Sequence, residues 1–124
     1  MKLIKLSLYL LFTSILSSCV SIGSQNDFSY DTQRLGYIQH KLGYAFCQMK
    51  TTVTNLNQNR LVTKVYVRLH FYDQAGNQLG SGDFRQDVHL MPGMKTTVMH
   101  DVNDSRNGKD ICSKTKKIIY ESLS

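Results

Sequence analysis

The sequence predicts an all-β domain, folded as a small antiparallel sandwich or open barrel of about five to seven strands. Apolar and polar side chains alternate over most segments from residue 44 to residue 102, which is the period of a half-buried strand. Turn-forming clusters interrupt this alternation roughly every ten residues. β-Branched and aromatic residues fill the segments between them, and the chain has 1 proline. An α+β variant is the alternative, because the last segment has some helical potential.

Residues 1–18 have the composition of an export signal. Lys2 and Lys5 supply a positive start, a mostly apolar run extends from residue 6 to residue 16, and two small serines precede Cys19. The run is short for a transmembrane helix, although a spanning helix and a plain secretory signal cut elsewhere are the alternatives. Export would place the rest of the chain outside the cytoplasm.

The end of this segment, Leu16-Ser17-Ser18-Cys19, resembles the lipobox of bacterial lipoprotein precursors. The resemblance implies that the Cys19 thiol receives a diacylglycerol, that residues 1–18 are removed, and that in many bacteria the new amino group is acylated as well. Two or three acyl chains hold a protein stably on a bilayer. The implied location is the cell envelope. Because Val20 stands where an aspartate would favour inner-membrane retention, the outer membrane facing the periplasm is expected.

The mature chain would run from Cys19 to Ser124, which is 106 residues and one small domain. Residues 19–33 are polar and lack a period, so they predict a flexible tether, and residues 34–124 then form the domain. Without Lys2 and Lys5, 13 basic side chains face 9 acidic ones. This excess is too mild to indicate nucleic acid as a partner. The predicted partners are the membrane, through the lipid anchor, and an envelope protein, with no small-molecule substrate.

Cys47 and Cys112 are the other two of the 3 cysteines. In an oxidising compartment two thiols usually form one disulfide bond. This bond would close a loop of about 65 residues and stabilise the fold by about 3–4 kcal/mol. A metal site with His40 or His100 is the alternative, but the cysteines lack the C-x-x-C spacing of a zinc site. No metal and no cofactor are predicted.

Two segments show the strand period most clearly. From Tyr44 onward, the buried face is predicted to hold Ala45, Cys47, Met49, Thr51 and Val53. In the segment 61–72, the predicted core side is Leu61, Thr63, Val65, Val67, Leu69 and Phe71. The opposite side is Val62, Lys64, Tyr66, Arg68, His70 and Tyr72.

The second half of the chain continues as strands joined by turns. Residues 73–77 predict a tight hairpin with Gly76 at positive φ. A weaker strand follows over residues 78–90, where Gly80 and Gly82 suggest a bulge. Met91-Pro92-Gly93 is a turn, residues 94–102 form a strand, and residues 103–109 form a polar turn. A last strand is expected from residue 116.

This pattern is similar to a known type of domain. Thr54-Asn55, the run from Val65 to Asp73, Gly76 and the turn Leu90-Met91-Pro92-Gly93 resemble the immunoglobulin-like FxLYD type of bacterial domain and the small YcfL-type periplasmic lipoproteins. The likeness covers about half of the mature chain, and the order of Phe and Leu is swapped in residues 69–73. It implies an immunoglobulin-like β-sandwich, and it brings no catalytic residues.

The chain carries no recognisable catalytic motif, and its single glutamate limits paired-carboxylate chemistry. We therefore expect no enzymatic activity. Tyr66, Arg68, His70 and Tyr72 form the candidate partner face, because aromatic residues and arginine dominate binding hot spots. The alternative is that a second sheet or the N-terminal segment covers this face. A free sheet edge, which can accept a partner strand, is the other expected docking place.

These observations predict a lipid-anchored envelope protein that binds or scaffolds a partner. One alternative is an accessory lipoprotein of a secretion or pilus machine, similar to a pilotin, which would need a groove for a partner's peptide. The other is an inhibitor of a host hydrolase such as lysozyme. An inhibitor would project a loop into the enzyme, and residues 103–109 are the expected loop.

Overall fold

The computed structural model describes residues 21–25, 27–39, 45–102 and 108–123. The predicted signal segment and Cys19 lie outside these residues, as do His40 and most of the predicted loop 103–109. Within them the chain forms strands and one short helix: β1 (Ser21–Gln25), β2 (Phe28–Gln39), β3 (Ala45–Asn55), β4 (Val62–Tyr72), β5 (Gln78–Leu90), β6 (Lys95–Val102), α2 (Gly108–Lys114) and β7 (Lys117–Ser122).

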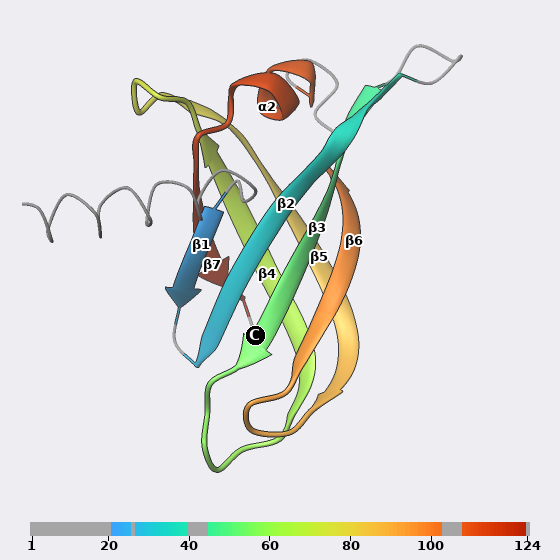
Figure 1. The fold of residues 1–124 in the computed structure, drawn as a ribbon, viewed down its shortest axis with the longest axis vertical. Coiled ribbons are helices and arrows are strands. Elements are labelled where there is room, and N and C mark those ends of the chain that lie inside the picture. Colours follow the sequence, from blue (N-terminus) through green and yellow to red (C-terminus); the bar gives the residue numbers. More distant parts are fainter. Residues whose placement is uncertain (1–20, 26, 40–44, 103–107, 124) are drawn as a thin grey trace, which may run out of the picture.

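The strands form two antiparallel sheets that pack face to face (Figure 1). One sheet has the order β1-β2-β3-β6, and the other has the order β5-β4-β7. In immunoglobulin-like sandwiches, strands A, B and E are neighbours in one sheet, and strands C′, C and F are neighbours in the other. Here β2, β3 and β6 correspond to the first set, and β5, β4 and β7 correspond to the second. The predicted small all-β sandwich is therefore confirmed. β1 lies beside β7, and α2 covers one end of the sandwich (Figure 1).

The core lies between the sheets and follows the predicted alternation. Met49 and Val53 of β3 and Val65, Leu69 and Phe71 of β4 are almost fully buried. The prediction fails at the start of β4, where Leu61 and Thr63 are exposed and Val62 is buried instead. The reason is a register shift between Val62 and Lys64, opposite Leu90 and Asp87 of β5. At this irregularity Thr63 and Lys64 are both exposed, so the alternation of β4 breaks between the buried Val62 and Val65.

The predicted disulfide bond joins Cys47 of β3 to Cys112 of α2, with 5.2 Å between their Cα atoms. Both cysteines are buried. The sequence predicted a polar turn before Cys112, whereas the structure has the helix α2 from residue 108. The guanidinium of Arg34 in β2 donates a hydrogen bond to the main-chain oxygen of Cys112. The helix is thus fastened to both β2 and β3.

The predicted tether over residues 19–33 is wrong where the structure describes it. Residues 21–25 form β1 and residues 28–33 begin β2, so the sandwich starts well before residue 34. Phe28, Tyr30 and Thr32 are buried and alternate with half-buried polar residues. The ring of Tyr30 stacks on that of Tyr120 in β7, with 4.7 Å between the ring centroids. These contacts make β2 part of the core.

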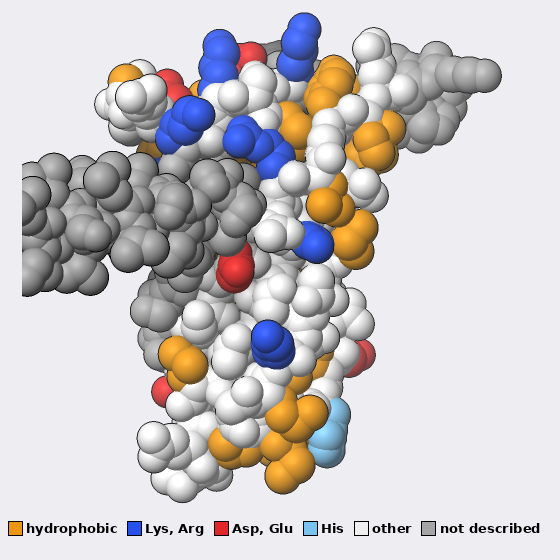
Figure 2. Space-filling model, in the orientation of Figure 1, with side chains coloured by type: hydrophobic (Ala, Val, Ile, Leu, Met, Phe, Trp, Pro, Cys, Tyr) orange, Lys and Arg blue, Asp and Glu red, His pale blue; other side chains and the backbone are white. Residues whose placement is uncertain are grey.

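The predicted turns have the backbone geometry that they require. Gly76 has a φ of 87° and Gly93 a φ of 81°, which L-residues with side chains rarely adopt. The predicted bulge near Gly80 corresponds to a register shift between Phe71 and Tyr72 of β4, opposite residues 78–80. Figure 2 views the β1-β2-β3-β6 sheet and shows apolar side chains grouped at the lower end and spread along the right flank of the upper half.

Candidate functional site

The predicted partner face lies on the outer side of the β5-β4-β7 sheet. Tyr66, Arg68, His70 and Tyr72 are all half-buried and point away from the core, because they alternate with the buried residues of β4. Their cross-strand neighbours are Arg85, Asp83, Ser81 and Gln78 of β5 on one side. No second sheet covers this face in the part of the chain that the structure describes.

The polar side chains of this face are largely paired with neighbours on the same sheet. The Arg68 guanidinium lies 3.5 Å from the carboxylate of Asp83, to which the Tyr66 hydroxyl also donates a hydrogen bond of 3.4 Å. His70 Nε2 lies 3.0 Å from the Glu121 carboxylate of β7. Groups already paired across strands offer less to a partner than free groups do, because binding must exchange one pair for another. The face is therefore more like a row of solvent-exposed cross-strand pairs than like a hot spot for protein binding.

A groove lies instead between β5 and β6. These two strands are consecutive and joined by a turn, yet they pair with different sheets: β5 with β4, and β6 with β3. Each is the last strand of its sheet on this side, and they diverge as they leave the turn (Figure 1). The groove between residues 86–90 and 94–99 has a volume of about 370 Å³. Each of its walls is a strand edge with which none of the described strands pairs.

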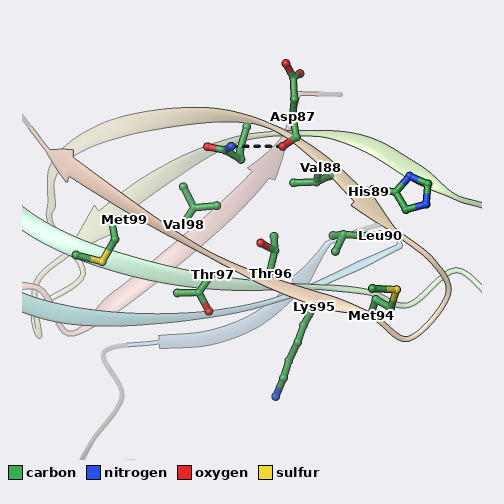
Figure 3. A pocket seen from close by; sticks show the side chains of 11 residues that line it. Asp87, Val88, His89, Leu90, Met94, Lys95, Thr96, Thr97, Val98 and Met99 are labelled. Carbon is green, nitrogen blue, oxygen red and sulfur yellow. Dashed lines mark hydrogen bonds between the residues drawn. The ribbon is translucent and has the colours of Figure 1, made fainter.

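Side chains of both strands form the floor of the groove (Figure 3). Val88 and Leu90 of β5 and Thr96 and Val98 of β6 point into the space between the strands. Leu90 and Val98 are buried, whereas Val88 and Thr96 are half-buried. At the rim, the Gln86 side-chain amide donates a hydrogen bond of 3.3 Å to the main-chain oxygen of Asp87. The surface that the groove exposes is thus mostly polar, above a floor whose apolar side chains are largely buried.

Asn55 holds the closed end of the groove in place. Its side-chain nitrogen donates to the main-chain oxygen atoms of Arg60 at 2.9 Å and of Leu90 at 3.0 Å. Its main-chain nitrogen donates to the oxygen of Met94 at 2.9 Å, and its own oxygen accepts from the nitrogen of Gly93 at 2.8 Å. Asn55 is fully buried, so these bonds satisfy polar groups that water cannot reach. It fastens the turn that joins β5 and β6 to the end of β3.

The other end of the groove closes where β5 and β6 approach each other. The rings of Phe84 in β5 and His100 in β6 stack with 4.7 Å between their centroids. Further along, a Cβ atom added to Gly82 would lie 3.3 Å from a methyl carbon of Val102. The glycine therefore allows β5 to pass close to β6. The groove is bounded by the turn at one end and by this stack at the other.

His100 also ends a chain of buried hydrogen bonds that crosses the core. The Tyr120 hydroxyl of β7 donates to Thr32 Oγ1 of β2 at 2.7 Å. Thr32 Oγ1 lies 2.9 Å from Thr51 Oγ1 of β3, which lies 2.7 Å from His100 Nε2. With Tyr120 donating and each threonine passing its own proton onward, Nε2 accepts the last bond. A neutral imidazole fits this arrangement.

Burial lowers the pKa of His100 to about 4, from an ordinary value of 6.5. The cause is desolvation, which disfavours the charged imidazolium. His100 is therefore neutral near pH 7 and acts as a hydrogen-bond acceptor rather than as a cation. A chain of hydroxyl groups that ends in a neutral histidine thus couples the two sheets.

The sequence predicted a docking edge in general terms and missed this groove. The signal that was present is the loss of clear alternation in the second half of β5, which reflects the bulge near residue 88. The short turn after Leu90 suggested a simple hairpin. It did not show that the two strands join different sheets.

Two further features concern metals and membranes. Among the residues that the structure describes, no three His, Cys, Asp or Glu side chains are grouped to hold a metal ion. No helix within the described ranges is long and apolar enough to cross a bilayer.

Comparison with known proteins finds no match, whether against family models, curated proteins or solved structures. The likeness to the FxLYD and YcfL-type families thus stays a prediction from the sequence motifs.

Proposed function

We propose that this chain is a lipid-anchored protein of the bacterial cell envelope that binds an extended segment of a partner protein in the groove between β5 and β6, and that it has no enzymatic activity. The observation that carries the binding role is that two strand edges, neither of them paired with another described strand, line one groove. The anchor is supported by the signal-like segment 1–18 and by the lipobox resemblance that ends at Cys19.

The groove suits a peptide in extended conformation. A strand edge presents main-chain N–H and C=O groups, with which an incoming strand can form hydrogen bonds. The five residues from Lys95 to Met99 span about 16 Å, which is the length of a short β-strand. Val88 and Thr96, which are half-buried, would contact those side chains of the peptide that point into the groove. We therefore expect the bound segment to alternate apolar and polar residues.

A groove for a partner's peptide is also what an accessory lipoprotein of a secretion or pilus machine requires. This role is the second candidate. It keeps the same mode of binding, and it specifies that the partner is a subunit of a secretion or pilus machine. The hydrolase-inhibitor alternative depends on the loop 103–109, of which residues 103–107 lie outside the described part of the chain. Nothing in the described residues favours it.

Site-specific crosslinking in cells tests the groove. A photoreactive residue at Thr96, which is half-buried in the groove, should crosslink to one segment of an envelope protein. Thr54 is the matched control, because it is also half-buried but lies on the outer face of β3. Adducts at Thr54 and none at Thr96 would exclude the groove as the binding site. A secretion-machine subunit crosslinked at Thr96 would support the role of an accessory lipoprotein. A hydrolase crosslinked there would support the role of an inhibitor.

A second experiment tests the anchor. Cys19→Ala should move the protein out of the detergent-soluble membrane fraction, because the residue that carries the acyl chains is lost. Labelling with a radioactive fatty acid should be lost in the same variant. Unchanged partitioning and unchanged labelling would rule out lipidation at Cys19, and the proposed location would then be wrong.

A further inference from the structure

The start of β1 determines which end of the domain a lipid at Cys19 would bring to the membrane. β1 begins at Ser21, two residues after Cys19, and two residues of extended chain reach about 7 Å at most. We propose that the end of the sandwich around α2 and the start of β7, here called the α2 end, rests directly on a membrane surface that contains anionic lipids. The proposal rests on the lipid anchor proposed above.

Topology places the start of β1 close to the α2 end. β1 and β7 lie side by side, and both run away from the α2 end (Figure 1). Ser21 is paired with Thr32 of β2, two residues before Arg34, whose guanidinium contacts α2. Because residues 21–25 form a strand of the sandwich and not a tether, little chain is left to separate the domain from the bilayer. The sandwich must therefore lie close to the lipid, on the side where β1 starts.

Basic side chains gather at the same end. Lys109 and Lys114 on α2, Lys116 after it and Lys117 at the start of β7 are all exposed. Figure 2 shows Lys and Arg side chains crowded around this end and sparse over the rest of the face. The acidic neighbours are Asp110, 3.5 Å from Lys114, and Asp73 of the adjacent hairpin.

The four lysines outnumber these two carboxylates. Each basic side chain held close to an anionic bilayer contributes about 1 kcal/mol of attraction. A basic surface beside the lipid anchor adds electrostatic attraction to the hold of the acyl chains. The charge of the α2 end therefore complements an anionic lipid surface.

Exposed apolar groups accompany the lysines. A depression of about 390 Å³ lies between the β4–β5 hairpin and the start of β7, lined by Tyr72, Lys116, Lys117 and Ile119 among others. Ile119 is 43% exposed. Apolar side chains framed by lysines are typical of surfaces that lie in the headgroup region. Tyr72, predicted as part of the partner face, would then contact lipid rather than protein.

The opposite end also exposes apolar side chains, including Leu61, Met91 and Met94. Apolar exposure alone therefore does not choose between the two ends. The start of β1 and the cluster of lysines both select the α2 end. The opposite end, with the closed end of the groove, would face away from the membrane.

Lysine footprinting of the full lipidated protein tests this orientation. The protein is placed in vesicles of phosphatidylethanolamine and phosphatidylglycerol, separated by flotation and labelled with an amine-reactive reagent. Mass spectrometry then reads each lysine. Labelling of Lys109, Lys114, Lys116 and Lys117 should fall several-fold relative to protein in detergent. Lys64 and Lys95 are exposed and lie towards the opposite end of the strands, so their labelling should not change.

The outcomes separate the two proposals. If floated protein showed the same change in labelling at all six lysines, relative to protein in detergent, the proposed orientation would be wrong. Protection of Lys64 and Lys95 instead would also overturn it. Either result would leave the anchor intact. Protein that fails to float would overturn the anchor and the orientation together. In vesicles of phosphatidylcholine alone, the protection of the four lysines should be smaller, because the electrostatic attraction is lost.

A second measurement does not depend on lysine chemistry. Ile119→Cys carrying a polarity-sensitive dye should shift its emission to the blue on phosphatidylglycerol vesicles. Met94→Cys, at the opposite end, is the matched control and should show no shift. Circular dichroism confirms that both variants are folded before they are compared. A blue shift at residue 94 and none at residue 119 would show that the end opposite α2 contacts the membrane, and the proposed orientation would be wrong.

Discussion

Acidification should destabilise the sandwich through His100. Burial lowers the pKa of this histidine to about 4 in the folded protein, against an ordinary value of 6.5. Between these two pH values the unfolded chain binds a proton that the folded chain does not. The free energy of unfolding should therefore fall as the pH drops below about 6.5, and the loss should be complete below about pH 4. At about 1.4 kcal/mol per pKa unit, the loss attributable to His100 is about 3 kcal/mol.

Urea unfolding at several pH values measures this loss, with His100→Gln as the comparison. Glutamine cannot titrate, and its side-chain oxygen can still accept a hydrogen bond from Thr51. Carboxylates titrate in both proteins, so the difference between the two unfolding free energies isolates the histidine. This difference should change by about 3 kcal/mol between about pH 7 and pH 4. Parallel curves over that range would show that His100 is not held neutral by burial, and that the buried chain of hydroxyls does not depend on it.

Three other changes test the core, the closed end of the groove and the disulfide bond. Phe71→Ala should lower the free energy of unfolding by about 3–5 kcal/mol, because the ring is fully buried; a loss below ~1 kcal/mol in chemical denaturation would contradict its place in the core. Asn55→Ala should cost about 2–4 kcal/mol, since two main-chain oxygens lose their donor, whereas Asn59→Ala on the surface should stay within about 0.5 kcal/mol. Reducing the Cys47–Cys112 bond should cost about 4 kcal/mol, and two titratable thiols in the unreduced protein would show that it does not form.

The strands that sequence predicted well are those whose two faces differ in polarity. β3 and β4 alternate between apolar and polar side chains, so their buried faces were identified except at the start of β4. β2 was mistaken for a tether because one of its buried positions is Thr32. That threonine belongs in the core only because Thr51 and Tyr120 complete its hydrogen bonds. Neither partner is near it in sequence, so no local pattern could reveal it.

The groove lay beyond sequence reasoning for a related reason. Its existence depends on which sheet each of two consecutive strands joins, and this choice is made by pairing with β3 and β4. The bonds of Asn55 to residues 60, 90, 93 and 94 then fix the turn. The outward direction of Arg68 and His70 was predictable from alternation. Their pairing with Asp83 and Glu121 was not, because it depends on the register between strands.

The place of β7 in its sheet limits when the sandwich can be completed. This last strand pairs with β4 on the side opposite β5, and it supplies Ile118 and Tyr120 to the core. Cys112, the partner of Cys47, precedes it by only a few residues. A chain that emerges N-terminus first therefore has an unpaired β4 edge until residues 117–122 have emerged, and an unpaired Cys47 until Cys112 has emerged. During that interval β4 is a template for aggregation, so the unfinished chain needs protection.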